Sequence, residues 1–271
     1  MILASIFVAS IISGLLGVGV AFPAIPILSI GDQDLVGSVQ PLALALNGVS
    51  ALFSAIAFTL NGHIDWKRAA MLSLSMCIAA PIGAFSAIWI ASRIHWTMFY
   101  LAVGVAIWLL FRPQRLAVRQ GASLVVIASL PMAFVCGMLG IGSGFVIAPL
   151  LIASGKSVRA SSAITSVAVV PCSFAAFAIR MTGEAHFDTI SAMPLFALSA
   201  VGDLVGGQLA SRIAADRALT VVFAATIIAL CGYRSLLAIR PPGLVAHTAV
   251  LAKIDPLDTS FLVGANPAMN A

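Results

Sequence analysis

Two glycine-rich stretches lie within apolar sequence, one in each half of the chain, and both have a composition that can bind an anion. The first runs from Gly14 to Pro26 (GLLGVGVAFPAIP) and the second from Gly137 to Pro149 (GMLGIGSGFVIAP). Each glycine weakens a helix by about 1 kcal/mol relative to alanine, so several in close succession predict a break. A helix that restarts after a break presents backbone N–H groups and the positive end of its dipole, which attract an anion.

The two stretches are parts of a tandem duplication. The glycines at 14, 17 and 19, the phenylalanine at 22 and the proline at 26 recur 123 positions later, as does the motif His63-Ile64-Asp65 at His186-Phe187-Asp188. A further match, between 83–94 and 202–213, has an offset of 119 and predicts that four residues are missing from the second half. Matching helix breaks in internal repeats are typical of a transporter's substrate site. Close packing of helices through small residues is the alternative explanation of the glycines.

The composition is that of a membrane protein. Hydrophobic residues make up 61% of the chain and charged residues 8%, and the mean hydropathy is +1.12. A helical span needs about 20 apolar residues, and a helix satisfies its own backbone groups. We therefore predict an all-α polytopic fold with about eight transmembrane helices in two tandem four-helix repeats. Their approximate ranges are 2–30 (broken at 17–21), 35–60, 69–91, 96–111, 122–153 (broken at 140–144), 158–179, 189–210 and 218–239.

These segments are predicted to form one membrane transport domain, residues 1–240, with repeats at about 1–112 and 121–240 and a loop-like tail at 241–271. Four segments per repeat predict that both halves enter the membrane in the same direction. Lys67 and the basic 112–119 loop then lie on the side of both termini, and Lys156 lies on the other side. The excess of basic residues on the first side predicts cytoplasmic termini. The net charge of +5 is spread over short loops, which argues against a nucleic acid partner.

Polar side chains within the spans are candidates for binding an oxyanion. Amide and hydroxyl groups are costly in lipid and normally face the interior of a helix bundle, where they can donate hydrogen bonds to a substrate. They can also bond to neighbouring helices or to their own backbone. The substrate contacts predicted from these polar groups and from the glycines are Gly17, Gly19, Asn47, Ser50, Gly140, Gly142, Gly144, Thr165, Ser166 and Ser173.

The two His-x-Asp motifs are weaker candidates for gating or proton coupling. They contain His63 with Asp65 and His186 with Asp188. Each aspartate immediately precedes a predicted helix, where its carboxylate can cap free backbone N–H groups. Capping is the favoured interpretation of both.

Asp203, inside a predicted span, and Arg180, at the end of another, are further candidates. Asp203 lies within the seventh segment and corresponds to Ala84 at the offset of 119. It can carry a coupling proton, cap locally or bond to another helix. Arg180 ends the sixth segment, where snorkelling to the membrane surface is expected. Pairing with Glu184 and attraction of anions are the alternatives for this arginine.

No enzyme signature, nucleotide-binding motif or metal-ligand cluster is found in the sequence, so no catalytic residue, metal or cofactor is predicted. The four cysteines are isolated within apolar segments and are expected to pack in the interior. Transport without a nucleotide site must be driven by a gradient, with a proton as a possible coupling ion. A non-transporting membrane subunit and a cation or metal permease remain as alternatives, although the latter would need more carboxylates within the membrane.

The glycine motif at Gly14 with the later Phe22 and Pro26, its repeat at Gly137–Pro149, and the sequence GHIDW from Gly62 resemble the TauE/SafE sulfite exporter family, also called the TSUP transporters, over about residues 1–240. The resemblance implies a permease of the bacterial cytoplasmic membrane for a small sulfur-containing or organic anion, such as sulfite, sulfoacetate or a related sulfonate.

The family usually has a third consecutive glycine, and this chain departs from that pattern in both copies. Val20-Ala21 replaces the glycine in the first copy, and Ser143 interrupts the second. The second copy is therefore expected to make most of the substrate contact, with Ser143 as a hydroxyl donor.

Overall fold

The computed structural model describes residues 2–29, 34–62, 64–90, 92–111, 122–183 and 189–212, together with Val221 and Ala225. The described residues are helical and form no strands. The helices are α1 (Ile2–Leu16), α2 (Ala21–Leu28), α3 (Gln40–Leu60), α4 (Trp66–Ser86), α5 (Ser92–Phe111), α6 (Ala122–Leu139), α7 (Gly144–Ala153), α8 (Val158–Met181) and α9 (Thr189–Arg212). A π-helical turn, Leu35–Val39, precedes α3, and a 3-10 turn, Ala87–Trp89, follows α4. All these elements lie in one compact unit, Met1–Cys231.

Four of the described helical stretches are long and apolar enough to cross a bilayer. They are Leu35–Leu60, Trp66–Ser86, Val158–Met181 and Ala192–Arg212. The apolar stretches Ile2–Leu16, Ile94–Leu109, Val125–Leu139 and Gly144–Ala153 are shorter. The first and fifth predicted segments are therefore each present as two shorter helices, and the eighth, at 218–239, falls almost entirely outside the described residues.

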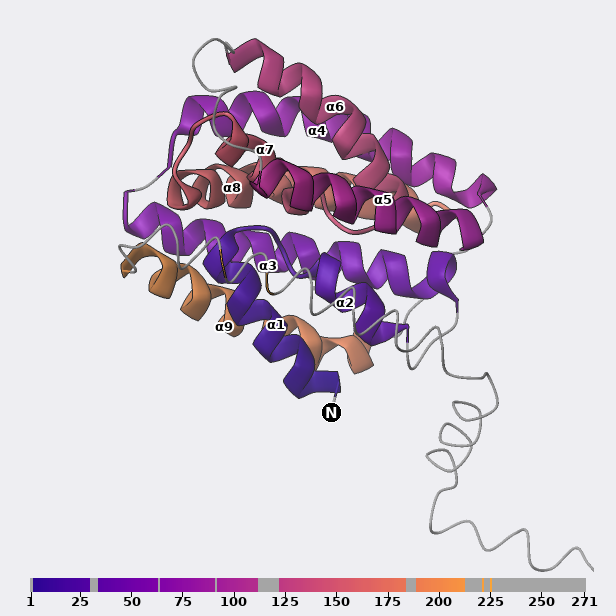
Figure 1. Ribbon diagram of the computed structural model, residues 1–271. Helices are drawn as coiled ribbons and strands as arrows, with labels where there is room; N and C mark the ends of the chain where they lie inside the picture. Colours follow the sequence, from indigo (N-terminus) through magenta and orange to yellow (C-terminus); the bar gives the residue numbers. More distant parts are fainter. Residues whose placement is uncertain are drawn as a thin grey trace, which may run out of the picture. The chain divides into compact units, whose positions relative to one another are not determined.

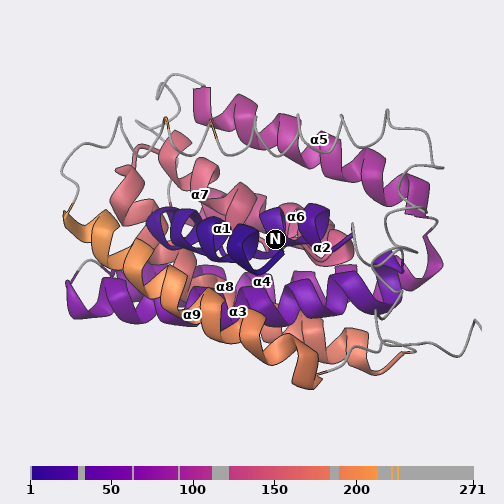
Figure 2. The same cartoon turned by 90° about the horizontal axis from the view of Figure 1, so that it is seen from below.

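The two halves of the described chain make equivalent helix contacts (Figure 1). Helix α1 packs on α9 in the same way that α6, its counterpart in the duplication, packs on α4. Helix α3 packs on α9, and its counterpart α8 packs on α4. Figure 2 shows α1 lying along α9 on one side of the molecule. The central contact is between α3 and α8 themselves.

The third and seventh predicted segments correspond at an offset of 123 positions, not at the expected 119. Two glycines that closely approach the backbone of another helix show this. A Cβ atom on Gly14 would overlap the backbone of Asp203, and one on Gly137 would overlap the backbone of Ala80. Both glycines and both of their contacts differ by 123 positions. Ala80, rather than Ala84, is therefore the counterpart of Asp203, and no four-residue deletion is needed.

A second pair of glycines gives the same offset. Gly83 approaches the backbone of Phe134, whereas Gly206 approaches that of Ile11. The sequence match at 119 arises because Gly202 lies one helical turn before Gly206. Small residues recur on this helix face at a spacing of four, so sequence alone can align the wrong pair.

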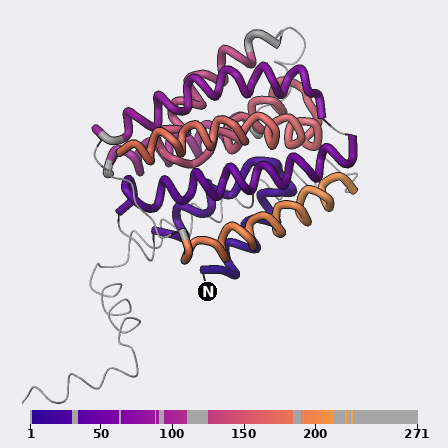
Figure 3. The backbone as a smooth tube through the Cα atoms, turned by 180° about the vertical axis from the view of Figure 1, so that it is seen from behind, coloured from indigo at the N-terminus to yellow at the C-terminus, as the bar shows by residue number. Residues whose placement is uncertain are grey.

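Helices α3 and α8 pack antiparallel, whereas halves that run in the same direction would have them parallel (Figure 3). The Asn47 side chain of α3 bonds to that of Ser173 in α8. Gln40 of α3 and Arg180 of α8 both contact the turn at 138–140. Residue numbers therefore fall along α3 while they rise along α8. Helices α3 and α8, which correspond at the offset of 123, therefore run in opposite directions.

The reversal has a local cause in the first half. Figure 1 shows the chain running inward along α1 and turning back along α2, and the two helices are in contact. Helix α1 runs in the same direction as α9, because Gly202 approaches Phe7 while Gly206 approaches Leu15. A broken helix that turns back reverses the course of the chain and changes the direction of the helices that follow it.

Candidate functional site

The glycine stretches interrupt the helices at corresponding positions. Between Leu16 and Ala21, Gly17 and Gly19 have φ angles of +63° and +84°. Between α6 and α7, the equivalent glycines at 140 and 142 both have φ of +70°. Residues with a side chain are disfavoured at such angles, so glycine at these positions permits the turn.

The two interruptions meet each other. The rings of Phe22 and Phe145, which correspond in the duplication, stack with centroids 3.9 Å apart and an interplanar angle of 8°. A Cβ atom on Gly144 would overlap the carbonyl group of Val18. The beginnings of α2 and α7 are therefore in direct contact where the halves meet.

Asn47 joins both interruptions through its side-chain amide. It is fully buried, its Oδ1 accepts a hydrogen bond from the Ala21 N–H at 3.0 Å, and its Nδ2 donates to Ser173 Oγ at 2.8 Å. Gly19 and Gly142 lie so close to this amide that a Cβ atom on either would overlap it. Asn47 is thus a predicted site residue whose side chain contacts both interruptions.

Ser50 completes the bonding of the first interruption. Its Oγ accepts a hydrogen bond from the Val20 N–H at 3.1 Å and lies 3.3 Å from Ser13 Oγ. With Asn47 on the Ala21 N–H, the first two backbone donors at the start of α2 are occupied by side chains. The expectation that these N–H groups are free to bind an anion is therefore wrong for the first interruption.

The second interruption is bonded differently. Ser143, which precedes α7, makes no side-chain capping hydrogen bond, and its Oγ lies 3.2 Å from Cys172 Sγ. The position equivalent to Asn47 is Val170, which has no polar group. The start of α7 thus lacks the remote side-chain acceptor that Asn47 supplies to α2.

Thr165 and Ser166 are buried but use their hydroxyl groups on their own helix. Thr165 donates to the carbonyl oxygen of Ser161, and Ser166 donates to that of Ala163 at 3.0 Å. This is the back-bonding that serine and threonine commonly make in helices. The structure brings Ser173 to Asn47 and Ser50 to the start of α2, whereas Thr165 and Ser166 bond within their own helix.

Asp65 caps the start of α4. Its Oδ1 accepts a hydrogen bond from the Arg68 N–H at 3.3 Å, and its Oδ2 lies 3.3 Å from Arg68 Nε and 4.0 Å from Lys156 Nζ. The carboxylate is half-exposed and lies at a helix end, as the capping interpretation expects. The other members of the His-x-Asp motifs, His63, His186 and Asp188, lie outside the described residues.

Asp203 is fully buried beside the first interruption. Its backbone lies against Gly14, and its Oδ2 accepts a hydrogen bond from Ser199 Oγ at 3.3 Å. Its Oδ1 has no hydrogen-bond partner among the described residues. The carboxyl group of Asp203 is thus buried next to the end of α1 that leads into the first interruption.

Arg180 does not snorkel. Its side chain is 2% exposed, and Nη2 donates to the Met138 carbonyl at 2.8 Å, at the end of α6. Gln40, which the sequence analysis passed over, is 1% exposed and lies against Gly140 on the same turn. Gln40 carries no distinguishing sequence signal, since it stands at the start of a helix next to a proline.

Comparison with known proteins decides the family. The family model described as "Sulfite exporter TauE/SafE" matches residues 2–234. The chain belongs to the TauE/SafE sulfite exporter family. No curated protein and no solved structure matches it. TauE/SafE membership, together with the apolar helices, makes the chain an integral membrane protein and indicates a transporter rather than an enzyme, with a small anion as substrate.

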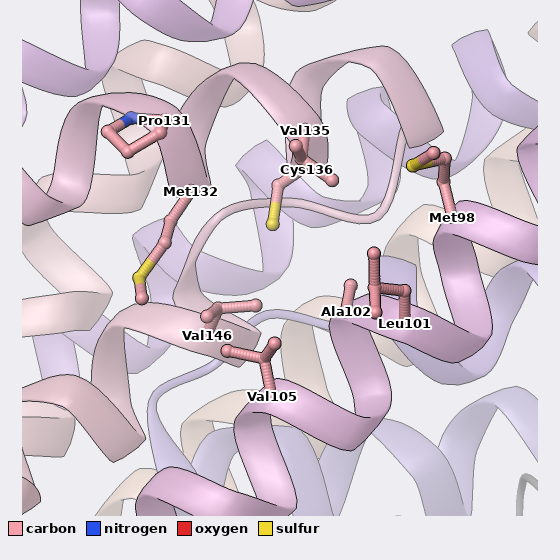
Figure 4. Close-up of a pocket in the computed structure, with 9 residues that line it drawn as sticks. All are labelled: Met98, Leu101, Ala102, Val105, Pro131, Met132, Val135, Cys136 and Val146. Atoms are coloured by element: carbon pink, nitrogen blue, oxygen red, sulfur yellow. The ribbon is translucent and has the colours of Figure 1, made fainter.

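A cavity of about 260 Å³ between α5, α6 and α7 is unsuited to such an anion (Figure 4). Its lining is apolar and consists of Met98, Leu101, Ala102, Val105, Pro131, Met132, Val135, Cys136 and Val146. An anion moved into apolar surroundings without hydrogen bonds would lose its hydration at great cost. The polar groups of this TauE/SafE protein lie instead around the two interruptions. Among the described residues, no group of three His, Cys, Asp or Glu could hold a metal ion.

Proposed function

We propose that this TauE/SafE protein is a secondary permease for a small anion of the sulfite, sulfonate or sulfoacetate class, which works by alternating access at its paired helix interruptions. The observation that carries the proposal is the meeting of both interruptions at Asn47. The two interruptions are related by pseudo-symmetry and share this polar contact. If one half moves against the other, the site at the contact can open first to one side of the membrane and then to the other. The start of α7, with Ser143, is the better anion site because the corresponding donors of α2 are already occupied.

Flux in proteoliposomes tests this function. Radiolabelled sulfite, thiosulfate and small sulfonates are expected to enter saturably, with a rate that responds to an imposed pH gradient. Asp203 is the candidate proton carrier, so Asp203→Asn should keep anion exchange but lose the response to the gradient. The absence of flux for every anion, with protein shown to be folded, would favour a partner subunit or another substrate class.

We also propose that the two halves are inverted repeats. The antiparallel α3 and α8 support this arrangement. If α1–α2 and α6–α7 each enter and leave the membrane on the same side, every half has three full crossings instead of four. The first half would cross with α3, α4 and α5, and the second with α8, α9 and the segment expected at 218–239. An odd number of crossings turns the second half over.

Inversion changes the predicted orientation. The α3–α4 and α7–α8 loops share a side in this arrangement, since Asp65 Oδ2 lies 4.0 Å from Lys156 Nζ. The count of apolar segments instead predicts that Lys67 and Lys156 lie on opposite sides. Apart from Arg234, which lies within the segment expected at 218–239, one side then holds nine basic residues and the other four. The nine are Lys67, Arg68, Arg112, Arg115, Arg119, Lys156, Arg159, Arg212 and Arg217; the four are Arg93, Arg180, Arg240 and Lys253. Because basic loops stay in the cytoplasm, both termini are proposed to lie outside it.

Cysteine labelling tests the orientation. In a variant whose native cysteines are replaced by serine, a membrane-impermeant maleimide added to intact bacterial cells should label Ala4→Cys. It should label Lys156→Cys only after the cells are permeabilised. The opposite pattern would restore the cytoplasmic termini expected from the sequence.

A further inference from the structure

A buried arginine and a buried glutamine lie against the second interruption with unused hydrogen-bonding groups. Arg180 Nη2 donates to the Met138 carbonyl at 2.8 Å, and the Cβ and Cγ atoms of Gln40 pack on Gly140. Arg180 Nε, Arg180 Nη1 and Gln40 Oε1 have no partner among the described residues, although both side chains are at least 98% buried, with exposures of 2% and 1%.

The guanidinium of Arg180 also lacks a carboxylate partner in the described part of the chain. The ion pairs found there join Asp65 to Arg68 and Lys156, at the surface. A buried charge without a counter-charge is strongly unfavourable, because removal from water is not offset by a partner. An anion bound at the unused N–H groups would remove this penalty.

The repeat itself does not require a cation here. At the offset of 123, the counterparts of Arg180 and Gln40 are Ala57 and Ala163. The same packing position is thus filled by small apolar residues in the other half. Polar residues at these positions, Arg180 and Gln40, therefore occur beside one interruption and not beside the other. This is expected if a protein with two similar halves has a single binding site.

We propose that Arg180 and Gln40 bind the oxygens of the transported anion beside the 138–140 turn. This inference rests on the proposed anion transport and names the positive charge that recognises the substrate. The unused N–H groups of Arg180 lie in the guanidinium plane, where the second N–H of Nη2 and the N–H of the nitrogen beside it, Nε or Nη1, form a pair of donors that fits two oxygens of a sulfite, sulfonate or carboxylate group. At the same turn, the Gln40 amide can donate from Nε2 to a substrate oxygen, whereas its unpartnered Oε1 can only accept a hydrogen bond, as from a protonated oxygen of the substrate.

The structural alternative is that Arg180 only neutralises the carbonyl end of α6, or pairs with Glu184. A cation at a helix C-terminus interacts favourably with the dipole. Arg180→Lys separates these roles, because lysine keeps the charge and can reach a carbonyl but has no planar donor pair. The double variant Arg180→Gln with Glu184→Gln tests for an ion pair.

The experiment measures radiolabelled sulfite uptake in proteoliposomes and, in detergent, the thermal stabilisation of the protein by sulfite. Arg180→Gln is expected to raise the KM about tenfold or more, since a charged hydrogen bond is lost. Arg180→Lys and Gln40→Leu should raise it less. Arg212→Gln, which removes an exposed arginine at the end of α9, should leave the KM unchanged. Sulfite should raise the melting temperature of the native protein and not that of Arg180→Gln.

A folded Arg180→Gln variant with native KM and native stabilisation by sulfite would overturn the inference, as would recovery of uptake in the double variant. If Arg180→Gln does not fold, a native KM for Arg180→Lys has the same consequence. Native protein that binds sulfite through Arg180 but does not transport it would contradict the proposed function alone. No stabilisation by sulfite, thiosulfate or sulfoacetate in the native protein would overturn the inference about Arg180.

Discussion

Replacing Gly144 by leucine is expected to abolish anion uptake while the protein still inserts into the membrane. A side chain at this position would overlap the Val18 carbonyl and come within 2.9 Å of a methyl group of Val169. Backbone cannot move aside as a flexible side chain can, so the two interruptions would be forced apart. Overpacking of this kind costs about 1–3 kcal/mol, which is enough to disturb the site without unfolding the helices.

Gly142→Leu should have the same effect for a different reason. Gly142 has a φ of +70°, which disfavours leucine, and the added side chain would overlap the Asn47 amide. Gly104→Leu is the matched control, because Gly104 lies in α5 and a Cβ atom there has no neighbour within 4 Å. Uptake in proteoliposomes is measured beside the amount of folded protein in the membrane. Native flux in both the Gly142 and the Gly144 variants would remove the interruptions from the transport mechanism.

Replacing Asn47 by leucine is expected to lower both stability and uptake. Leucine has a similar size but cannot accept the Ala21 N–H hydrogen bond or donate to Ser173. A buried donor left without a partner costs about 1–3 kcal/mol. The start of α2 would lose its position relative to α8. A loss of this free energy at the site corresponds to a fall in uptake of about tenfold or more.

Two further variants sharpen the test of Asn47. Asn47→Asp can accept the Ala21 N–H bond and a bond from the Ser173 hydroxyl, so it should be more stable than Asn47→Leu. Its negative charge beside both interruptions should nevertheless oppose anion binding. Asn61→Leu, at the exposed end of the same helix, is the control. Thermal unfolding and sulfite uptake are measured for all three; a fully active Asn47→Leu variant would show that the bridge is dispensable.

Much of the membrane fold could be predicted from the sequence because it follows from local composition. Long apolar segments with few charges must form helices in a bilayer, since no water is present to satisfy the backbone. The helix interruptions fall where glycines cluster, because glycine itself can adopt a positive φ without a steric penalty. The capping role of Asp65 is likewise local, since the carboxylate bonds to a backbone group three residues away.

The inverted direction that we propose for the second half could not be predicted in this way. Counting apolar segments treats each broken stretch as one crossing, whereas α1 and α2 turn back on each other. The true counterpart of Asp203 was also missed. A helix face with small residues every four positions can be aligned in two registers, and only the contact between Gly14 and Asp203 distinguishes them.

The sequence by itself determined that this chain is a helical membrane protein of the TauE/SafE family with a duplicated glycine motif, because those features depend on composition and on short motifs. Only the tertiary structure decided which donors are occupied and which charges are buried. Asn47 bonds across 126 positions to Ser173, and Arg180 reaches back 42 positions to Met138. Such contacts arise when distant helices pack together, and no local pattern in the chain encodes them.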